Sequence, residues 1–178
     1  MKRANLFLSV LSLLALTGCG SPLTVDEART YAKENYSLTK AAETYVRYTE
    51  REVVKVKKAT GIFKDYPLEE KDETETDVIA DAPILTSAFF LSLPNTAEIT
   101  LNSGSISVYV AIDAKDAIDM QIEGITGQST YTLKTNNLGL YTSEVEKVKF
   151  KVDASANGIT VKGELEAESV KTYTYQKK

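Results

Sequence analysis

The sequence contains no histidine and no tryptophan, and its only cysteine is Cys19. Without histidine the chain cannot build a Ser-His-Asp triad, a Cys-His pair, a histidine general base or a His-ligated zinc site. A single cysteine cannot close an internal disulfide bond. Carboxylates, lysines, tyrosines and hydroxyl groups are the side chains left for catalysis. We therefore expect a protein that is not an enzyme and that uses no metal and no cofactor.

Basic side chains are outnumbered as well. The chain has 21 lysines and arginines against 25 aspartates and glutamates, which gives a net charge of −4 and a pI near 5.1. Nucleic acid repels a chain of this charge, so we expect no nucleic-acid partner. Anionic lipid headgroups do not attract such a chain either, so any affinity for a membrane has to come from another feature.

One long apolar run stands near the start of the chain. The basic pair Lys2 and Arg3 precedes residues 6–16, which are apolar apart from two serines. The run suits the core of a signal peptide and is shorter than the roughly 20 residues that a membrane-spanning helix needs. The motif Leu16-Thr17-Gly18-Cys19 follows, and it closely resembles the lipobox of bacterial lipoproteins. The alternative is an ordinary secretory peptide in which a cysteine happens to stand at this position.

The lipobox resemblance implies a processed and lipidated protein. Residues 1–18 would form a cleaved signal peptide, residues 19–23 a lipidated tether and residues 24–178 a single domain. The Cys19 thiol would carry a diacylglyceryl group, and two or more acyl chains anchor a protein stably. The implied location is the extracytoplasmic side of the cell envelope. This means the outer membrane if the cell has two membranes, and otherwise the outer face of the plasma membrane.

The first structural signal of the mature chain is a capping box formed by Thr24 and Glu27. An apolar stripe follows it with helical spacing, so we predict a helix over residues 25–36. Residues 41–59 are rich in β-branched and aromatic residues, which favours a long strand. Their apolar positions also fit the stripe of a helix, and Gly61 ends the element in either case.

Residues 64–77 are interrupted by Pro67 and crowded with carboxylates, which predicts an acidic loop. Clustered carboxylates are also the ligands that calcium prefers. The segment lacks the glycine and the final glutamate of an EF-hand, so a solvated acidic loop is the favoured interpretation.

Residues 81–94 form the most apolar segment after the signal region. Asp81 suits an N-cap, Pro83 suits a first helical turn and Pro94 stops the element, so we predict a short buried helix. The alternative is a flap over a cavity that holds a hydrophobic ligand, or a patch that dips into the bilayer.

The pattern changes to a period of two from residue 97 onward. Short alternating segments are joined by turn sequences, and Asn157-Gly158 is a strong hairpin signal. The strands are predicted near residues 98–101, 106–112, 118–122, 131–133, 140–152, 159–165 and 170–174. Because such strands have one apolar face, the two predicted helices have to cover it. We predict an α+β fold, in which a curved antiparallel β-sheet (a meander) carries the N-terminal helix and the short apolar helix on its concave face.

Two carboxylate pairs are candidates for the chemistry of a hydrolase. They are Asp113 with Asp116 and Glu144 with Glu146. Each pair lies in a predicted turn or on a polar strand face, and this favours solvated charges over a carboxylate-based hydrolase.

A lysine stripe is the second candidate site. It consists of Lys147, Lys149 and Lys151, with Lys162 on the next strand. Alternation places these lysines on the solvent face, where they could bind a phosphate or a lipid headgroup. Lysines on a strand also prevent unwanted pairing between sheets, and this is the favoured interpretation.

The order of these elements on a lipidated chain resembles the half-barrel lipid-carrier lipoproteins, the LolA and LppX-like group. The resemblance is one of architecture and has no shared residue motif. It implies that acyl chains bind between sheet and helices, and the residues expected to line that space are Ile84, Phe89, Phe90, Val108 and Val110. The leading hypothesis is thus a membrane-anchored, non-catalytic module that binds a lipid or another hydrophobic small molecule. The alternative is a structural or envelope-assembly lipoprotein that has a filled core and binds an envelope protein.

Overall fold

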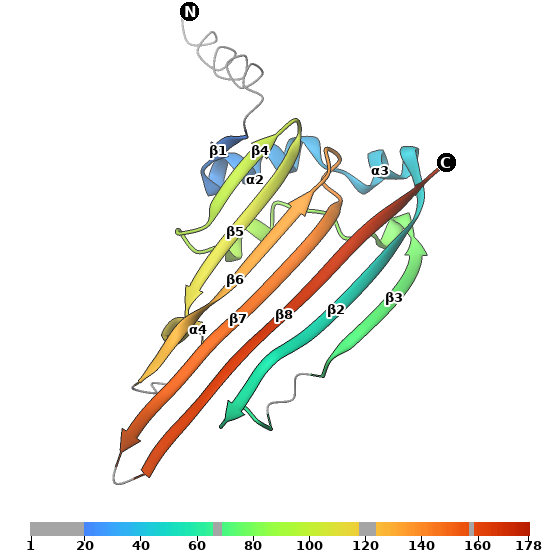
Figure 1. Cartoon of the computed structure of the whole chain (residues 1–178). Helices are drawn as coiled ribbons and strands as arrows, with labels where there is room; N and C mark the ends of the chain where they lie inside the picture. The colour runs from blue at the N-terminus through green and yellow to red at the C-terminus, as the bar shows by residue number, and fades with distance from the viewer. Residues whose placement is uncertain (1–19, 66–68, 118–123, 157–158) are drawn as a thin grey trace, which may run out of the picture.

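The computed structural model describes residues 20–65, 69–117, 124–156 and 159–178, and these residues build one antiparallel sheet (Figure 1). Its eight strands lie in the order β1-β4-β5-β6-β7-β8-β2-β3. The strands are β1 (Ser21–Leu23), β2 (Tyr45–Gly61), β3 (Lys71–Val78), β4 (Glu98–Asn102), β5 (Ser105–Asp113), β6 (Ile125–Thr135), β7 (Tyr141–Ala156) and β8 (Ile159–Lys177). The helices are α2 (Val25–Asn35), α3 (Leu38–Thr44), α4 (Ala114–Ala117) and the 3₁₀ helices η1 (Ile79–Asp81) and η2 (Phe89–Ser92).

The meander predicted from the alternating pattern is confirmed. Strands β4 to β8 are neighbours in chain order, while β2 and β3 extend the sheet beyond β8 and β1 extends it beyond β4. The last two predicted strands are one long strand, β8. The strand predicted near residues 118–122 and the hairpin at Asn157-Gly158 lie outside the described residues.

Helix α2 forms where the capping box predicts it. The Thr24 side chain accepts the backbone N–H of Glu27, and the Glu27 carboxylate accepts the backbone N–H of Thr24 at 2.9 Å. Within the segment predicted as a tether, residues 19–23, Ser21–Leu23 form β1 and pair with β4. Only Gly20 lies between residue 19 and the sheet.

The ambiguous segment at residues 41–59 is divided between two elements. Its first residues complete the short helix α3, and a strand runs from Tyr45 to Gly61, as the β-branched composition predicts. Gly61 has a φ of 57° and stands so close to β8 that a Cβ atom would lie 1.7 Å from the Lys162 carbonyl oxygen. Only glycine fits this approach at the last residue of the strand.

The acidic loop predicted for residues 64–77 is wrong for its second half, which forms the edge strand β3. Cross-strand contacts to β2 offset the low strand propensity of these residues. Arg51 donates to both carboxylate oxygens of Asp72 at 2.8 and 2.7 Å, and the hydroxyls of Thr49 and Thr76 lie 2.9 Å apart. Pairing with a long neighbour therefore overrides composition at this edge of the sheet.

The helix predicted for residues 81–94 is also wrong. Ile84 forms a β-bridge with Leu140, the Leu85 N–H donates to the Gly139 carbonyl at 2.9 Å, and the Tyr141 N–H donates to the Pro83 carbonyl at 3.1 Å. These bonds hold the segment extended against the turn between β6 and β7. Within residues 81–94, only Asp81, the last residue of η1, and Phe89–Ser92, the 3₁₀ helix η2, are helical.

The pairing register assigns the side chains to two faces, because residues directly opposite in a sheet share a face. The covered face carries Val108, Val110 and Leu133, on which Ala28 and Ala32 of α2 pack together with Leu85 and Phe90. The opposite face, here called the outer face, carries Lys147, Lys149 and Lys151.

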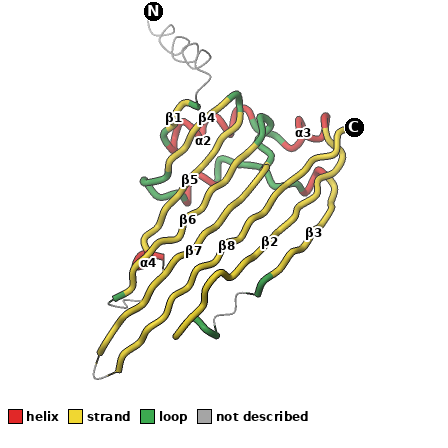
Figure 2. Tube along the Cα trace, in the orientation of Figure 1, coloured by secondary structure: helices red, strands yellow, loops and turns green. Residues whose placement is uncertain are grey.

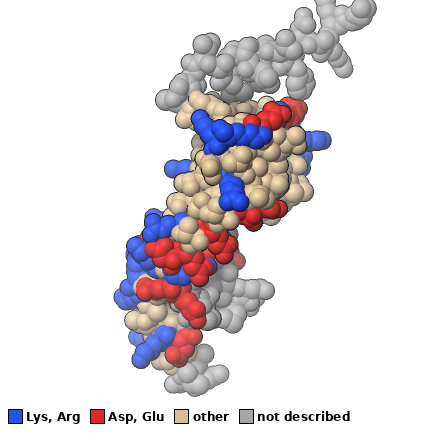
Figure 3. All heavy atoms as spheres, turned by 90° about the vertical axis from the view of Figure 1, so that its right-hand side faces the viewer, with Lys and Arg blue, Asp and Glu red and all other residues tan. Residues whose placement is uncertain are grey.

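The end of the sheet at which β1 begins and β8 finishes is called the near end. The opposite end, at which β7 finishes and β8 begins, is called the far end (Figure 1). Helices α2 and α3 lie at the near end, behind the sheet in Figure 2. The side view in Figure 3 shows that this half is thicker than the far half. A second apolar cluster, on the covered face of the far half, consists of Phe63, Ala114, Phe150, Val152 and Leu165.

Candidate functional site

Three of the five residues predicted to line a hydrophobic cavity are buried core residues, and the other two, Ile84 and Phe89, are partly buried. Phe90, Val108 and Val110 are 1%, 0% and 4% exposed, and they belong to one cluster with Phe89 at its margin. Ile84 packs in a neighbouring cluster with Leu140. Side chains that expose almost no surface to a water-sized probe cannot border a space that holds a ligand. The structure thus brings four of these five residues together, but as packing partners of one another.

Three of the four carboxylates in the predicted pairs are exposed. Asp113 ends β5 and Asp116 lies on α4, and both are exposed. Glu146 is also exposed, whereas Glu144 is half-buried on the covered face. Glu144 was expected to be a solvated charge on a polar face, and its half-buried position opposite Leu133 on the covered face corrects that expectation.

Glu144 accepts hydrogen bonds from two tyrosines on neighbouring strands. The Tyr131 hydroxyl donates to one carboxylate oxygen at 2.7 Å, and the Tyr173 hydroxyl donates to the other at 2.6 Å. Burial and the neighbouring carboxylate raise the pKa of both phenols far above the ordinary value of a tyrosine. Both phenols therefore stay neutral donors, and the carboxylate joins β6, β7 and β8.

A second polar group continues this row towards β3. The Lys171 ammonium lies 3.3 Å from Glu50 and 3.9 Å from Glu52, and Lys71 lies 2.6 Å from Glu52. The hydrogen bond from Lys71 holds the pKa of the Glu52 carboxyl below its usual value. Within the described residues these carboxylates are bound to protein partners, so their chemistry is that of a structural network that crosses the covered face.

The lysine stripe of the sequence analysis does form a surface. On the outer face, three glutamates of β8 (Glu164, Glu166 and Glu168) lie between three lysines of β7 (Lys147, Lys149 and Lys151) and three lysines of β2 (Lys55, Lys57 and Lys58). Six lysines and three glutamates give this ladder a local charge of +3, within an acidic protein. Figure 3 shows the basic residues gathered along one margin of the far half.

The ladder contains a groove of about 550 Å³. Its lining residues are Lys58, Thr126, Gly127, Gln128, Lys149, Phe150, Lys151, Glu164, Leu165 and Glu166. The polar side chains come from the outer face, whereas Phe150 and Leu165 belong to the cluster on the covered face and contribute main chain. The groove is therefore open to the surface and carries several charged and polar residues.

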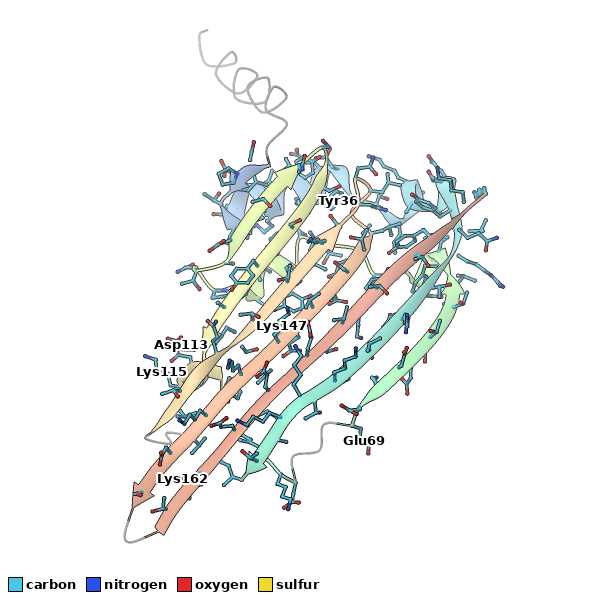
Figure 4. The ribbon with its side chains drawn as sticks, viewed as in Figure 1. Tyr36, Glu69, Asp113, Lys115, Lys147 and Lys162 are labelled. Atoms are coloured by element: carbon cyan, nitrogen blue, oxygen red, sulfur yellow. The ribbon has the colours of Figure 1, made fainter. Side chains whose placement is uncertain are left out.

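Lys162, the fourth lysine of the predicted stripe, lies nearer the far end than Lys147 (Figure 4). It pairs with Asp153 at 3.3 Å and lines a smaller hollow of about 340 Å³ together with Lys151 and Glu164. The stripe is thus divided between two adjoining hollows.

The groove includes residues that sequence reasoning missed. A β-bulge between Val56 and Lys58 turns two consecutive lysines of β2 towards the glutamates of β8, and nothing in the alternating pattern predicts it. Thr126 and Gln128 lie opposite Lys151 and Lys149 in a register that the turn sequences do not determine. The position of Glu144 could have been found, because it shares its parity with Val148, Phe150 and Val152.

No group of three or more acidic or cysteine side chains in the described residues could hold a metal ion. None of the described helices has the length and apolar character needed to cross a bilayer. Cys19 and the rest of the lipobox lie outside the described residues. Comparison of the chain with protein-family models, curated proteins and solved structures finds no match.

Proposed function

We propose that this chain is a membrane-anchored, non-catalytic lipoprotein of the cell envelope that binds its partner or ligand at the surface of its sheet. The observation that carries the proposal is the packing of Phe90, Val108 and Val110. These side chains were expected to enclose a hydrophobic ligand, and they pack against one another instead. A protein with a filled interior acts through its surface, as in the envelope-assembly alternative.

The proposed anchor rests on the resemblance of Leu16-Thr17-Gly18-Cys19 to a lipobox. If Cys19 carries acyl chains, Gly20 is the only residue between the lipid and β1. This short connection keeps the near end at the bilayer and points the far half away from it. The proposed address is the extracytoplasmic side of the envelope.

A carrier of hydrophobic ligands, like the half-barrel lipoproteins, is the second candidate. The packing of α2 and η2 on one face of a one-sided sheet favours it. A carrier also needs a cavity of several hundred Å³ between these layers. Among the described residues, Leu85, Phe90 and Val108 are almost completely buried between these layers, and this packing favours the surface-acting protein of the two.

Metabolic labelling with a clickable fatty acid tests the anchor. The native chain should incorporate label and sediment with membranes, and the Cys19→Ser chain should incorporate none. Equal labelling of both chains, or of neither, contradicts acylation of Cys19.

Mass spectrometry of the purified full Cys19→Ser chain tests the filled core. We expect no stoichiometric lipid in organic extracts, because the core has no room for an acyl chain. A lipid that co-purifies at about one molecule per chain would favour the carrier and contradict the surface-acting protein.

A further inference from the structure

The groove on the outer face has two walls of different character. On the β8 and β2 side, Lys58 forms an ion pair with Glu164 and holds the pKa of that carboxyl below its usual value. That lysine is therefore largely neutralised by its partner. The β6 and β7 side is built from Thr126, Gln128, Lys149 and Lys151.

Within the described residues, none of these four side chains makes a hydrogen bond or an ion pair. Lys147 and Lys162 differ in this respect, since Glu168 and Asp153 hold them at 3.2 and 3.3 Å. The groove therefore combines a hydroxyl, an amide and two ammonium groups that lie beyond ion-pair distance of any described carboxylate, although the charges of both lysines help to lower the pKa of Glu164. These are donors without an assigned acceptor.

The register brings the four donors to one patch. Thr126 lies directly opposite Lys151, and Gln128 lies directly opposite Lys149, in adjacent pairs of the same β6–β7 ladder. Neighbouring pairs on one face are roughly 5 Å apart across the strands and roughly 7 Å apart along them. Long, flexible lysine side chains and two short polar ones can converge on a single tetrahedral anion over a patch of this size.

Main chain forms the floor of the groove at Gly127. This residue has a φ of 114°, and a Cβ atom would lie 1.9 Å from the Lys149 carbonyl oxygen. A side chain at this position would force β6 away from β7. Glycine thus keeps the two strands, and with them the four donors, at their close spacing.

We infer that this patch binds a phosphate group, held by the ammonium groups of Lys149 and Lys151 and by the neutral donors of Thr126 and Gln128. A phosphate offers more charged acceptor oxygens to converging donors than a monovalent carboxylate does. Glu166 repels the ligand from the opposite wall, and this fixes the ligand to the β6–β7 side. The phosphate can belong to a soluble molecule or to a lipid headgroup.

The orientation of the groove rests on the proposed anchoring, which would turn the far half away from the protein's own bilayer. Phosphate binding itself does not depend on acylation. Loss of fatty-acid labelling and loss of phosphate binding are therefore separate results.

The test uses the full Cys19→Ser chain, so that no acyl chain contributes to binding. Calorimetry at low salt with tripolyphosphate should show saturable binding, and the Lys149→Gln/Lys151→Gln variant should weaken it about tenfold or more. The control is Lys57→Gln/Lys147→Gln, which removes the same charge from the same face. Both control lysines pair with Glu168 outside the groove, so binding should stay within about twofold.

A second arm identifies the source of the phosphate. Flotation with phosphatidylcholine vesicles is compared with flotation of vesicles that contain phosphatidylglycerol. Association with the second kind alone, lost in Lys149→Gln/Lys151→Gln, assigns the patch to lipid headgroups, whereas tripolyphosphate binding alone assigns it to soluble phosphates. Gln128→Leu should weaken whichever binding is seen without changing the net charge.

Three outcomes overturn the inference. One is the absence of binding in both arms. The second is equal weakening by the groove variant and by its charge-matched control, which would reduce the effect to the general field of the lysine ladder. The third is unchanged binding in the groove variant. Circular dichroism of each variant checks that the sheet is intact.

Discussion

The Glu144 carboxylate shows how one side chain holds several strands together. It is half-buried and receives one phenol on each oxygen, from Tyr131 and from Tyr173. Hydrogen bonds to a charged acceptor are stronger than neutral ones, and removing the acceptor leaves both donors without their partner.

We therefore expect Glu144→Ala to lower the free energy of unfolding by about 1–3 kcal/mol. Urea denaturation followed by circular dichroism measures the change. Glu146→Ala is the matched control, since this carboxylate is exposed on the same strand and should alter stability by less than about 0.5 kcal/mol. Equal effects at both positions would show that the two phenols do not depend on Glu144.

Tyrosines also determine how stability responds to alkaline pH. Burial raises the pKa of Tyr36 to about 12, and burial with the nearby Glu144 raises the pKa of Tyr141 to about 12. Unfolded tyrosine titrates near 10. Above that pH the unfolded chain releases phenol protons that the folded chain retains, so ionisation favours unfolding.

Stability should accordingly be constant with respect to these groups below pH 10 and should fall as the pH rises from 10 to 12. Urea midpoints across this range measure the loss, and absorbance near 295 nm follows the phenolates. In the native protein part of the phenolate signal should appear only together with unfolding. A urea midpoint that does not change between pH 10 and pH 12 would contradict the assignment.

At the scale of elements, the start of α2 can be tested against the start of α3. Thr24 caps α2 through its side chain and the reciprocal Glu27 bond, whereas Ser37 precedes α3 without a side-chain capping bond. Thr24→Ala should therefore cost about 1 kcal/mol of unfolding free energy, and Ser37→Ala clearly less. Thermal unfolding of both variants makes the comparison. A larger loss for Ser37→Ala would mean that the capping box has no energetic role.

Local rules predicted the elements whose causes lie within their own residues. The capping box predicted α2, the period of two predicted the meander, and Gly61 predicted the end of β2. Each of these signals is read from neighbouring residues along the chain, so no knowledge of distant contacts was needed.

The elements that sequence reasoning missed depend on distant partners. Residues 71–78 become a strand because β2 runs beside them, and Arg51 supplies the charge that Asp72 needs. Residues 83–85 stay extended because the turn before Tyr141 offers them backbone partners. Apolar composition predicted correctly that this segment is buried, but it could not predict that distant hydrogen bonds would replace a helix.

The residues of the candidate site also fall into a group that the sequence predicts and a group that depends on distant partners. Alternation placed Lys147, Lys149 and Lys151 on the solvent side, which the register confirms. The neighbours that turn two of them into one wall of a groove come from β6, and the lysines of the other wall come through a bulge in β2. Register and bulges are properties of the folded sheet, so a single sequence does not give them.

At the scale of the whole molecule, the positions of β1 and of the far end predict how an anchored chain is oriented relative to the bilayer. Ser21 pairs with Leu101, so the first described residues of the chain, next to the proposed lipid attachment, lie beside the turn between β4 and β5. From Tyr141 to Ser155, β7 extends roughly 45 Å at about 3.3 Å per residue. A chain tethered through Gly20 alone should hold its two ends at very different distances from the bilayer.

This difference can be measured with one dye placed at either end. Acylation would occupy Cys19, so Ser103→Cys and Ser155→Cys would each supply a single free thiol, at the near and the far end respectively. Energy transfer from the dye to a lipid acceptor should be efficient at residue 103 and weak at residue 155. Inserting ten Gly/Ser residues after Gly20 should reduce the contrast, because a flexible linker no longer fixes the orientation. Similar transfer at both positions in the native-length chain would mean that the sheet lies along the membrane, with its far half against the bilayer.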